Sequence, residues 1–173
     1  MTVRLATPND VPAIARVQVD SWDGVYRGLI PDDVIDRLNV EHRVAQWTRF
    51  FERDHDQETL LVAEHDHTVV GMASLGPTRD EDLKGAVGEV RAIYVLPEHW
   101  GHGHGWDLME AGEEWFGAHG FDAAVLWVLT TNDKARGFYE AIGWARDGAT
   151  KIEDIYGALV PEVRYRTSLG PIA

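Results

Sequence analysis

The stretch between residues 87 and 119 restricts the fold of this chain more than any other part of it. Residues 87–96 alternate as a strand does, and Pro97, which lacks a backbone N–H, should end that strand. Glycine then occupies every second position over 101–105, and from 108 to 119 the apolar residues recur at helical spacing. The sequence therefore predicts a strand, a tight glycine-rich turn and a helix.

Such a turn is suited to binding an anion. It leaves backbone N–H groups free at the positive end of the helix dipole, where a phosphate or pyrophosphate binds well. The alternating glycines differ from the dinucleotide-binding fingerprint, and no Lys-Ser/Thr pair follows as in a P-loop. A tight strand-to-helix connection that binds nothing is the alternative.

The composition favours one globular α/β domain over residues 1–173. Hydrophobic residues make up 45% of the chain, and no apolar run reaches the roughly 18 residues that a membrane-spanning helix needs. The N-terminal residues contain no signal-peptide core, so we expect a cytoplasmic protein with no membrane partner. Because the chain has no cysteine, disulfides, thiolate metal ligands and a cysteine nucleophile are excluded.

The charge indicates the class of partner. A net charge of −13 makes the chain a poor candidate for binding nucleic acid and favours cationic partners such as amines. An anionic ligand would depend on local N–H groups and local basic side chains. The alternative is that the acidity serves only solubility.

The other elements follow from periodicity and turn signals. Helices are expected from the cap signal at 7–10 to about Trp22, and over 31–38, 44–51 and 131–142. Strands are expected over 2–6, 59–64, 67–75 and 123–129, from 144 onward, and over 162–168. Residues 21–31 are interpreted as a loop, and the last two strands as paired across a loop that contains Asp154. The continuous apolar run 123–129 is typical of a strand buried on both faces, as in a parallel pair.

Two motifs resemble those of the GNAT superfamily of acetyl-CoA-dependent N-acyltransferases. Residues 93–105, Ile-Tyr-Val-Leu-Pro-Glu-His-Trp-Gly-His-Gly-His-Gly, are similar to the family's cofactor signature, Gln/Arg-x-x-Gly-x-Gly/Ala. Residues 131–144, Thr-Asn-Asp-Lys-Ala-Arg-Gly-Phe-Tyr-Glu-Ala-Ile-Gly-Trp, are similar to its Asn-x-x-Ala-x-x-Phe-Tyr-x-x-x-Gly-Phe segment. The resemblance implies a mixed, mostly antiparallel sheet with a parallel βαβ cofactor-binding unit and flanking helices. Trp100 departs from the family, which usually has Gln or Arg at this position.

The resemblance also implies a direct transfer, in which an amine attacks the thioester carbonyl of acetyl-CoA without a covalent enzyme intermediate. The backbone around Ile93 and Val95 would bind the pantetheine arm, and residues 101–106 would bind the pyrophosphate. The residues implied in cofactor binding are Ile93, Tyr94, Val95, Trp100, Gly101, His102, Gly103, His104, Gly105, Trp106, Asn132, Lys134 and Arg136.

Two residues are candidates for proton transfer. An aliphatic amine is mostly protonated at pH 7 and must lose a proton before attack, which a positioned carboxylate can accept. Glu89 stands at the spacing of the base in histone-acetylating members of the family, although an ion pair with Arg91 is the alternative role. Tyr139 matches the family's general acid, and its alternative role is a core aromatic bonded to a backbone carbonyl.

The acceptor side is less specific. In this fold the early helices form the wall of the acceptor pocket, so Trp22, Asp23, Tyr26, Arg27 and Tyr156 are candidate contacts for an amine of a small molecule or peptide. The alternative for Trp22 is that its side chain only packs in the hydrophobic core. A homodimer is compatible with the resemblance.

Three other readings compete with acetyl transfer. A metal protein could use His99, His102 and His104, but their glycine-rich turn is better explained by phosphate contact, and we expect no metal. A non-catalytic acetyl-CoA-binding module is permitted by Trp100. An acyltransferase that uses another acyl-CoA would have the same motifs, although the acidic charge disfavours an anionic acyl group.

Overall fold

The structure is a computed structural model that describes residues 2–53 and 55–170. The strands are β1 Thr2–Leu5, β2 Thr59–His65, β3 Thr68–Pro77, β4 Val87–Val95, β5 Ala123–Leu129, β6 Ala145–Ile155 and β7 Ala158–Ser168. The helices are α1 Val11–Tyr26, α2 Asp32–Ile35, α3 Val40–Glu52, α4 His104–Ala118 and α5 Asp133–Ala141, with short 3-10 turns η1 Pro8–Asp10 and η2 Pro97–His99.

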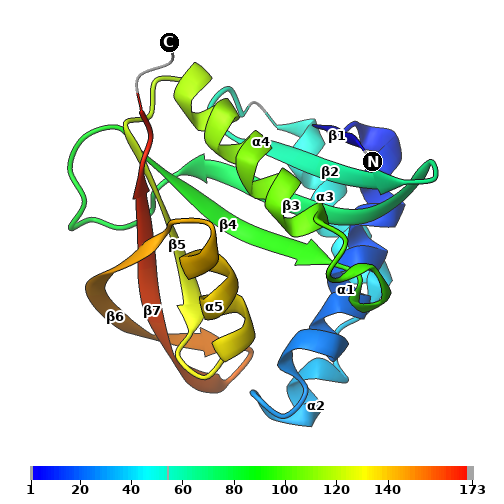
Figure 1. The fold of residues 1–173 in the computed structure, drawn as a ribbon. Helices are drawn as coiled ribbons and strands as arrows, with labels where there is room; N and C mark the ends of the chain where they lie inside the picture. Colours follow the sequence, from blue (N-terminus) through cyan, green and yellow to red (C-terminus); the bar gives the residue numbers. More distant parts are fainter. Residues whose placement is uncertain (1, 54, 171–173) are drawn as a thin grey trace.

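Within the described residues the strands form one seven-stranded sheet, in the order β1-β2-β3-β4-β5-β7-β6 (Figure 1). Neighbouring strands are antiparallel except β4 and β5, which are parallel and joined through α4. The predicted mixed, mostly antiparallel sheet with one parallel βαβ unit is therefore confirmed. None of the described helices has the length and apolarity needed to cross a membrane.

Helices cover both faces of the sheet (Figure 1). On one face, α4 and α5 pack their apolar side chains, among them Leu108, Phe116 and Tyr139, onto the central strands. On the other face, α1 and α3 form a second apolar cluster against β2 and β3, which includes Ile14 and Trp47. The parallel contact between β4 and β5 thus lies in the middle of the sheet, with helices packed over both faces.

Helix α1 is longer than the sequence predicted. It continues past the expected end at Trp22 to Tyr26, so the expected loop over 21–31 begins only at Arg27. Gly24 allows the extended helix to pack against η2, because a Cβ atom at this position would lie 2.5 Å from a side-chain carbon of Pro97. The close packing against η2 offsets the roughly 1 kcal/mol that glycine costs inside a helix.

The last hairpin also differs from the prediction. Only two residues, Tyr156 and Gly157, separate the end of β6 from the start of β7. Both residues of this turn have positive φ angles, 51° and 92°. Such a turn matches the twist of the paired strands. Asp154 therefore lies in β6 and not in a loop, and its carboxylate accepts the Gly157 N–H at 2.6 Å.

Candidate active site

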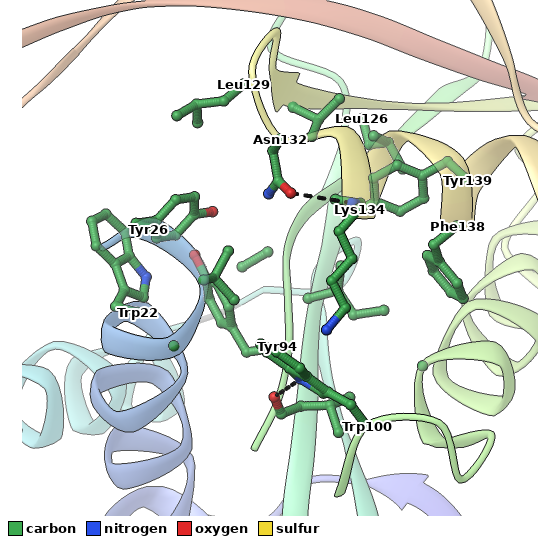
Figure 2. Close-up of a pocket in the computed structure, with 18 of the residues that line it drawn as sticks. Trp22, Tyr26, Tyr94, Trp100, Leu126, Leu129, Asn132, Lys134, Phe138 and Tyr139 are labelled. Atoms are coloured by element: carbon green, nitrogen blue, oxygen red, sulfur yellow. Dashed lines mark hydrogen bonds between the residues drawn. The ribbon is translucent and has the colours of Figure 1, made fainter. Parts of the chain in front are cut away.

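Strands β4 and β5 separate along their length and open a wedge in the sheet. Their parallel pairing covers only residues 87–89 of β4 and 123–125 of β5. Beyond these residues β4 stays paired with β3, and β5 stays paired with β7. A cavity of about 900 Å³ occupies the wedge and is lined by both strands, the glycine-rich turn, α1 and α5 (Figure 2).

Backbone groups of β4 face this cavity. The N–H of Leu96 bonds to the Val70 carbonyl at 2.9 Å, on the β3 side. Backbone groups of successive strand residues alternate in direction, so those of Ile93 and Val95 face away from β3. The Val95 carbonyl accepts the indole N–H of Trp100 at 2.8 Å. The N–H groups of Ile93 and Val95 are thus directed into the wedge.

The glycine-rich turn leads directly into α4. Gly101 and Gly103 have φ angles of 77° and 88°, which glycine adopts without strain. Gly103 is the N-cap residue, and the first N–H groups of the 15-residue helix have no acceptor within it. Gly101, Gly103, His104, Gly105 and Trp106 line the cavity, whereas His102 is exposed outside it. This end of the cavity suits a phosphate group.

Lys134 supplies a positive charge at the same end. Its Nζ atom lies 3.2 Å from the centroid of the Trp100 ring, a cation–π contact that holds the ammonium group over the cavity (Figure 2). Trp100 itself is uncharged, but its ring positions the charged ammonium group of Lys134. Arg136 is not brought to the cavity, because its guanidinium bonds to the Thr130 carbonyl at 2.8 Å.

Asn132 and Tyr139 line the wall opposite β4 (Figure 2). The side-chain oxygen of Asn132 accepts the Ala135 N–H at 3.1 Å and caps α5, which leaves its amide N–H₂ group for the cavity. Tyr139 is buried, and burial raises the pKa of its hydroxyl, which therefore stays protonated at neutral pH. Burial and the nearby Tyr94 both raise this pKa, and no hydrogen bond from a described residue contributes to the shift.

Aromatic side chains close the far end of the cavity. Trp22 and Tyr26 from α1 contact each other edge-on at 4.7 Å between centroids, and Tyr94 lies beside them (Figure 2). Burial raises the pKa of Tyr26 and of Tyr94, so both hydroxyls are neutral hydrogen-bonding groups.

Three other predicted acceptor contacts are engaged in structural bonds. Arg27 lines the cavity, but its guanidinium bonds to Asp23 at 2.5 Å and to Asp36 at 2.9 Å. Asp23 and Tyr156 are not brought to the cavity, and the Tyr156 hydroxyl accepts a bond from Arg43 at 2.7 Å.

Glu162 on β7 lines the cavity and was missed by the sequence reasoning. It is 9% exposed and stands opposite Leu129 of β5. Burial raises the pKa of its carboxyl, against the opposing effect of the Lys151 ammonium at 3.5 Å. A second cavity of about 400 Å³, lined mostly by charged residues, shares Glu162 with the first. The available signal was the alternation of Val160, Glu162 and Arg164, which puts two charged residues on the buried face of a strand.

Glu89 lies outside the large cavity and lines only the second one. Its carboxylate accepts bonds from the backbone N–H of Arg79 at 3.0 Å and from that guanidinium at 2.5 Å. Burial acts to raise the pKa of Glu89, but the bonds from Arg79 outweigh it and hold the pKa below the usual value. Arg91, the partner considered from the sequence, pairs instead with Glu58 at 2.6 Å.

Comparison with known proteins identifies relatives that match most of the chain. The model of the acetyltransferase (GNAT) family matches residues 22–144. An uncharacterized N-acetyltransferase of Bacillus subtilis, YuaI, is 35% identical over 164 residues, which cover 94% of this chain and 90% of that protein. An uncharacterized N-acetyltransferase of Archaeoglobus fulgidus is 33% identical over 140 residues, which cover 80% of this chain and 89% of that protein.

Solved structures share the fold at lower identity. A ribosomal-protein-alanine N-acetyltransferase from Brucella melitensis superposes with a TM-score of 0.75 at 24% identity, covering 98% of this chain and all of that chain. The PaiA N-acetyltransferase from Thermoplasma acidophilum, in complex with coenzyme A, has a TM-score of 0.70 at 20% identity and covers 96% of this chain and 98% of that chain. The yncA protein of Salmonella typhimurium, with acetyl-CoA, has a TM-score of 0.73 at 22% identity, over 100% of this chain and 96% of that chain.

Proposed function

The chain belongs to the GNAT acetyltransferase family, and on that premise we propose that residues 1–173 form one domain that transfers an acetyl group from acetyl-CoA to a primary amine. The observation that carries this proposal is the continuity of the cavity. One cavity joins the glycine-rich turn at the start of α4, the free backbone edge of β4, the Tyr139 hydroxyl and the Glu162 carboxylate. An anion site, a carbonyl-polarising edge and two proton-transfer groups therefore meet in one space.

Acetyl-CoA would lie along the wedge with its phosphates at the turn. The first N–H groups of α4 and the Lys134 ammonium would bind the pyrophosphate, in place of the side chain that Trp100 has replaced. The pantetheine arm would run between β4 and Asn132. A backbone N–H of Ile93 or Val95 would polarise the thioester carbonyl, as preorganised donors do at a developing oxyanion. Two proteins of the same fold whose structures hold coenzyme A or acetyl-CoA support the choice of this cofactor.

In the transfer step the amine nitrogen attacks the thioester carbonyl carbon, so that a C–N bond forms and the C–S bond breaks. Glu162 is assigned as the base that takes the proton from the amine, because it lines the cavity and its raised pKa favours proton acceptance. Tyr139 is assigned as the group that donates to the departing thiolate. Glu89, bonded to Arg79 in the second cavity, is the alternative base.

The acceptor would be a cationic amine held between Glu162 and the aromatic side chains of Trp22, Tyr26 and Tyr94. Aromatic faces attract an ammonium group, and a carboxylate pairs with it before accepting its proton. The net charge of −13 favours the approach of such a substrate.

The transfer can be tested by following release of the CoA thiol from acetyl-CoA in the presence of polyamines, amino-acid amides and peptide N-termini. We expect release well above hydrolysis with at least one amine, and a product heavier by one acetyl group in mass spectra. Propionyl-CoA and succinyl-CoA in the same assay compare the acyl groups. If acetyl-CoA binds but no amine raises thiol release, the non-catalytic reading suggested by Trp100 replaces this proposal.

A further inference from the structure

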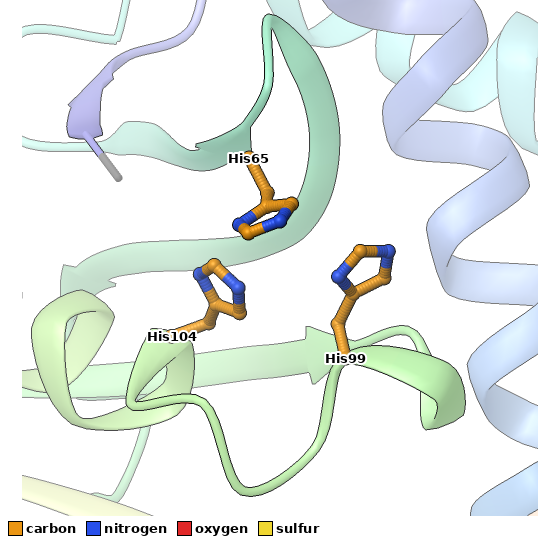
Figure 3. Close-up of side chains that lie close together, drawn as sticks. All are labelled: His65, His99 and His104. Carbon is orange, nitrogen blue, oxygen red and sulfur yellow. The ribbon is translucent and has the colours of Figure 1, made fainter.

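Three histidines from separate segments converge behind the glycine-rich turn. His65 ends β2, His99 ends η2 and His104 is the first residue of α4. Their ring centroids are 5.3 Å, 5.5 Å and 5.8 Å apart, and Figure 3 shows the rings facing one common space. One ring nitrogen from each residue lies within 4.8 Å of the others. This set differs from the group considered in the sequence, because His65 takes the place of His102.

His104 makes the cluster unusual. Its side chain is 1% exposed, and neither ring nitrogen has a hydrogen-bond partner among the described residues. A buried polar group without a partner costs about 1–3 kcal/mol. An aliphatic side chain would pack here at no such cost, so this imidazole points to a ligand.

We propose that His65, His99 and His104 bind one divalent transition-metal ion, with zinc as the best match. Three imidazoles and one open position are a common zinc coordination, with Zn–N distances of about 2.0–2.1 Å. Two nitrogens around a tetrahedral ion are then about 3.3 Å apart, so the rings must approach one another by up to about 1.5 Å. His65 and His99 are only partly buried and can rotate to do so. Water or the neighbouring Asp66 carboxylate could occupy the fourth position.

The bound ion would add a direct link between three elements. It would tie the hairpin of β2 and β3 to η2 and to the first turn of α4. Its charge would also stand directly behind the N–H groups of the turn. In a chain of net charge −13, this would be a concentrated positive charge close to the anion site.

The test uses untagged, chelator-treated protein titrated with ZnCl₂ in a calorimeter and with CoCl₂ in a spectrophotometer. We expect one ion per chain, a dissociation constant below about 1 µM and the strong visible bands of tetrahedral Co²⁺. Thermal unfolding should shift upward by at least about 5 °C with excess zinc, because the ion binds only the folded chain. None of these measurements requires acetyl-CoA, so their failure is distinct from failure of the proposed acetyl transfer.

Matched variants identify the ligands. His65→Ala, His99→Ala and His104→Leu should each weaken zinc binding by at least about 100-fold, whereas His67→Ala and His102→Ala should leave it unchanged. His67 and His102 are exposed histidines next to the cluster and report adventitious binding. The proposal is overturned if no saturable one-to-one binding occurs, or if the two control variants lose as much affinity as His65→Ala and His99→Ala. Those two ligands are partly exposed, so the test stands even if His104→Leu fails to fold.

Discussion

The pKa values of two buried glutamates near the wedge are shifted in opposite directions, because the two carboxylates have different partners. Glu89 receives bonds from Arg79, which lower its pKa, whereas the pKa of Glu162 is raised by burial that Lys151 offsets only in part. A base must be ionised but still attract a proton. The raised pKa of Glu162 favours acceptance of a proton, and its carboxylate also lines the large cavity.

Glu162→Gln should therefore lower kcat by about 100-fold and remove the acid limb of the pH profile. The limb arises because the carboxylate is inactivated as the pH falls through its raised pKa, which lies above that of an ordinary glutamate. The measurement is kcat/KM against pH for the wild type and for Glu162→Gln and Glu89→Gln. If Glu89→Gln loses the limb and Glu162→Gln retains it, the roles of the two residues are reversed.

Tyr139→Phe should reduce kcat by about 100-fold and leave the affinity for acetyl-CoA within about twofold. The substitution removes only the hydroxyl, and the ring still fills its place in the core beside Tyr165, at 5.9 Å between centroids. Steady-state kinetics and direct binding measurements on the same sample separate the two effects. Full activity in this variant would leave Tyr139 as a core residue only.

Residue roles were predictable from sequence only where a motif fixed the position. Asn132, Lys134 and Tyr139 all fall in one motif and all line the cavity. Glu162 lies outside both motifs, and its approach to β5 depends on the pairing of β7. That pairing is a contact between distant segments, which periodicity cannot predict.

At the scale of elements, α4 packs closely on the part of β4 that pairs with β5. Gly88 sits in the paired part of β4, and a Cβ atom there would lie 2.4 Å from two carbons of the Phe116 ring. The glycine thus allows the helix to pack directly on the parallel pair.

Gly88→Ala should destabilise the protein by about 1–3 kcal/mol, since the Phe116 ring must move from a packed core. Gly137→Ala is the matched control, because position 137 is exposed in α5 with no atom within 4 Å of a new Cβ. That change should be neutral or stabilising by up to about 1 kcal/mol. Urea unfolding of both variants measures the difference, and equal midpoints would contradict the packing argument.

The ends of helices and strands were predictable where a local sequence signal ends the element. They were not predictable where a contact with a distant segment determines the end. Strand β5 and the end of α5 before Gly143 fall where expected. The extension of α1 past Trp22 depends on Gly24 meeting Pro97, more than 70 residues away. The two-residue turn at Tyr156 likewise depends on the pairing of β6 with β7 up to Ile155 and Ala158.

At the scale of the whole molecule, carboxylates held by arginines link stability to pH. Bonds from Arg4 hold the pKa of Asp10 well below its usual range, with N–O distances of 2.8 Å. A carboxyl whose pKa is lowered by folding contributes stability above its unfolded pKa, near 4, and that contribution is lost as the pH falls through the folded pKa.

The melting temperature should therefore fall by about 5 °C or more between pH 6 and pH 3. Asp10→Asn should melt lower than the wild type at pH 6 and lose less on acidification, because its contribution is already absent. Calorimetric scans across the pH range measure both effects. Parallel curves for the two proteins would show that the Arg4–Asp10 pair has no part in the acid response.

The overall architecture was predictable because two motifs at a fixed separation imply one parallel βαβ unit within a mixed sheet. The wedge itself was not, because it depends on where the pairing of β4 with β5 stops. The contact between Lys134 and Trp100 could not be predicted from the sequence either. It places a positive charge near the position where the family usually has Gln or Arg.

The most direct test of the central account is calorimetric titration with acetyl-CoA of the wild type, Lys134→Ala and Lys84→Ala. Lys84 is an exposed lysine in the loop between β3 and β4, outside the cavity lining. We predict one-to-one binding to the wild type, a dissociation constant raised about 10-fold by Lys134→Ala, equivalent to about 1.4 kcal/mol, and no change in Lys84→Ala. Absence of wild-type binding up to millimolar acetyl-CoA would contradict the cofactor site. Unchanged affinity in Lys134→Ala would contradict the placement of the phosphates beside Trp100.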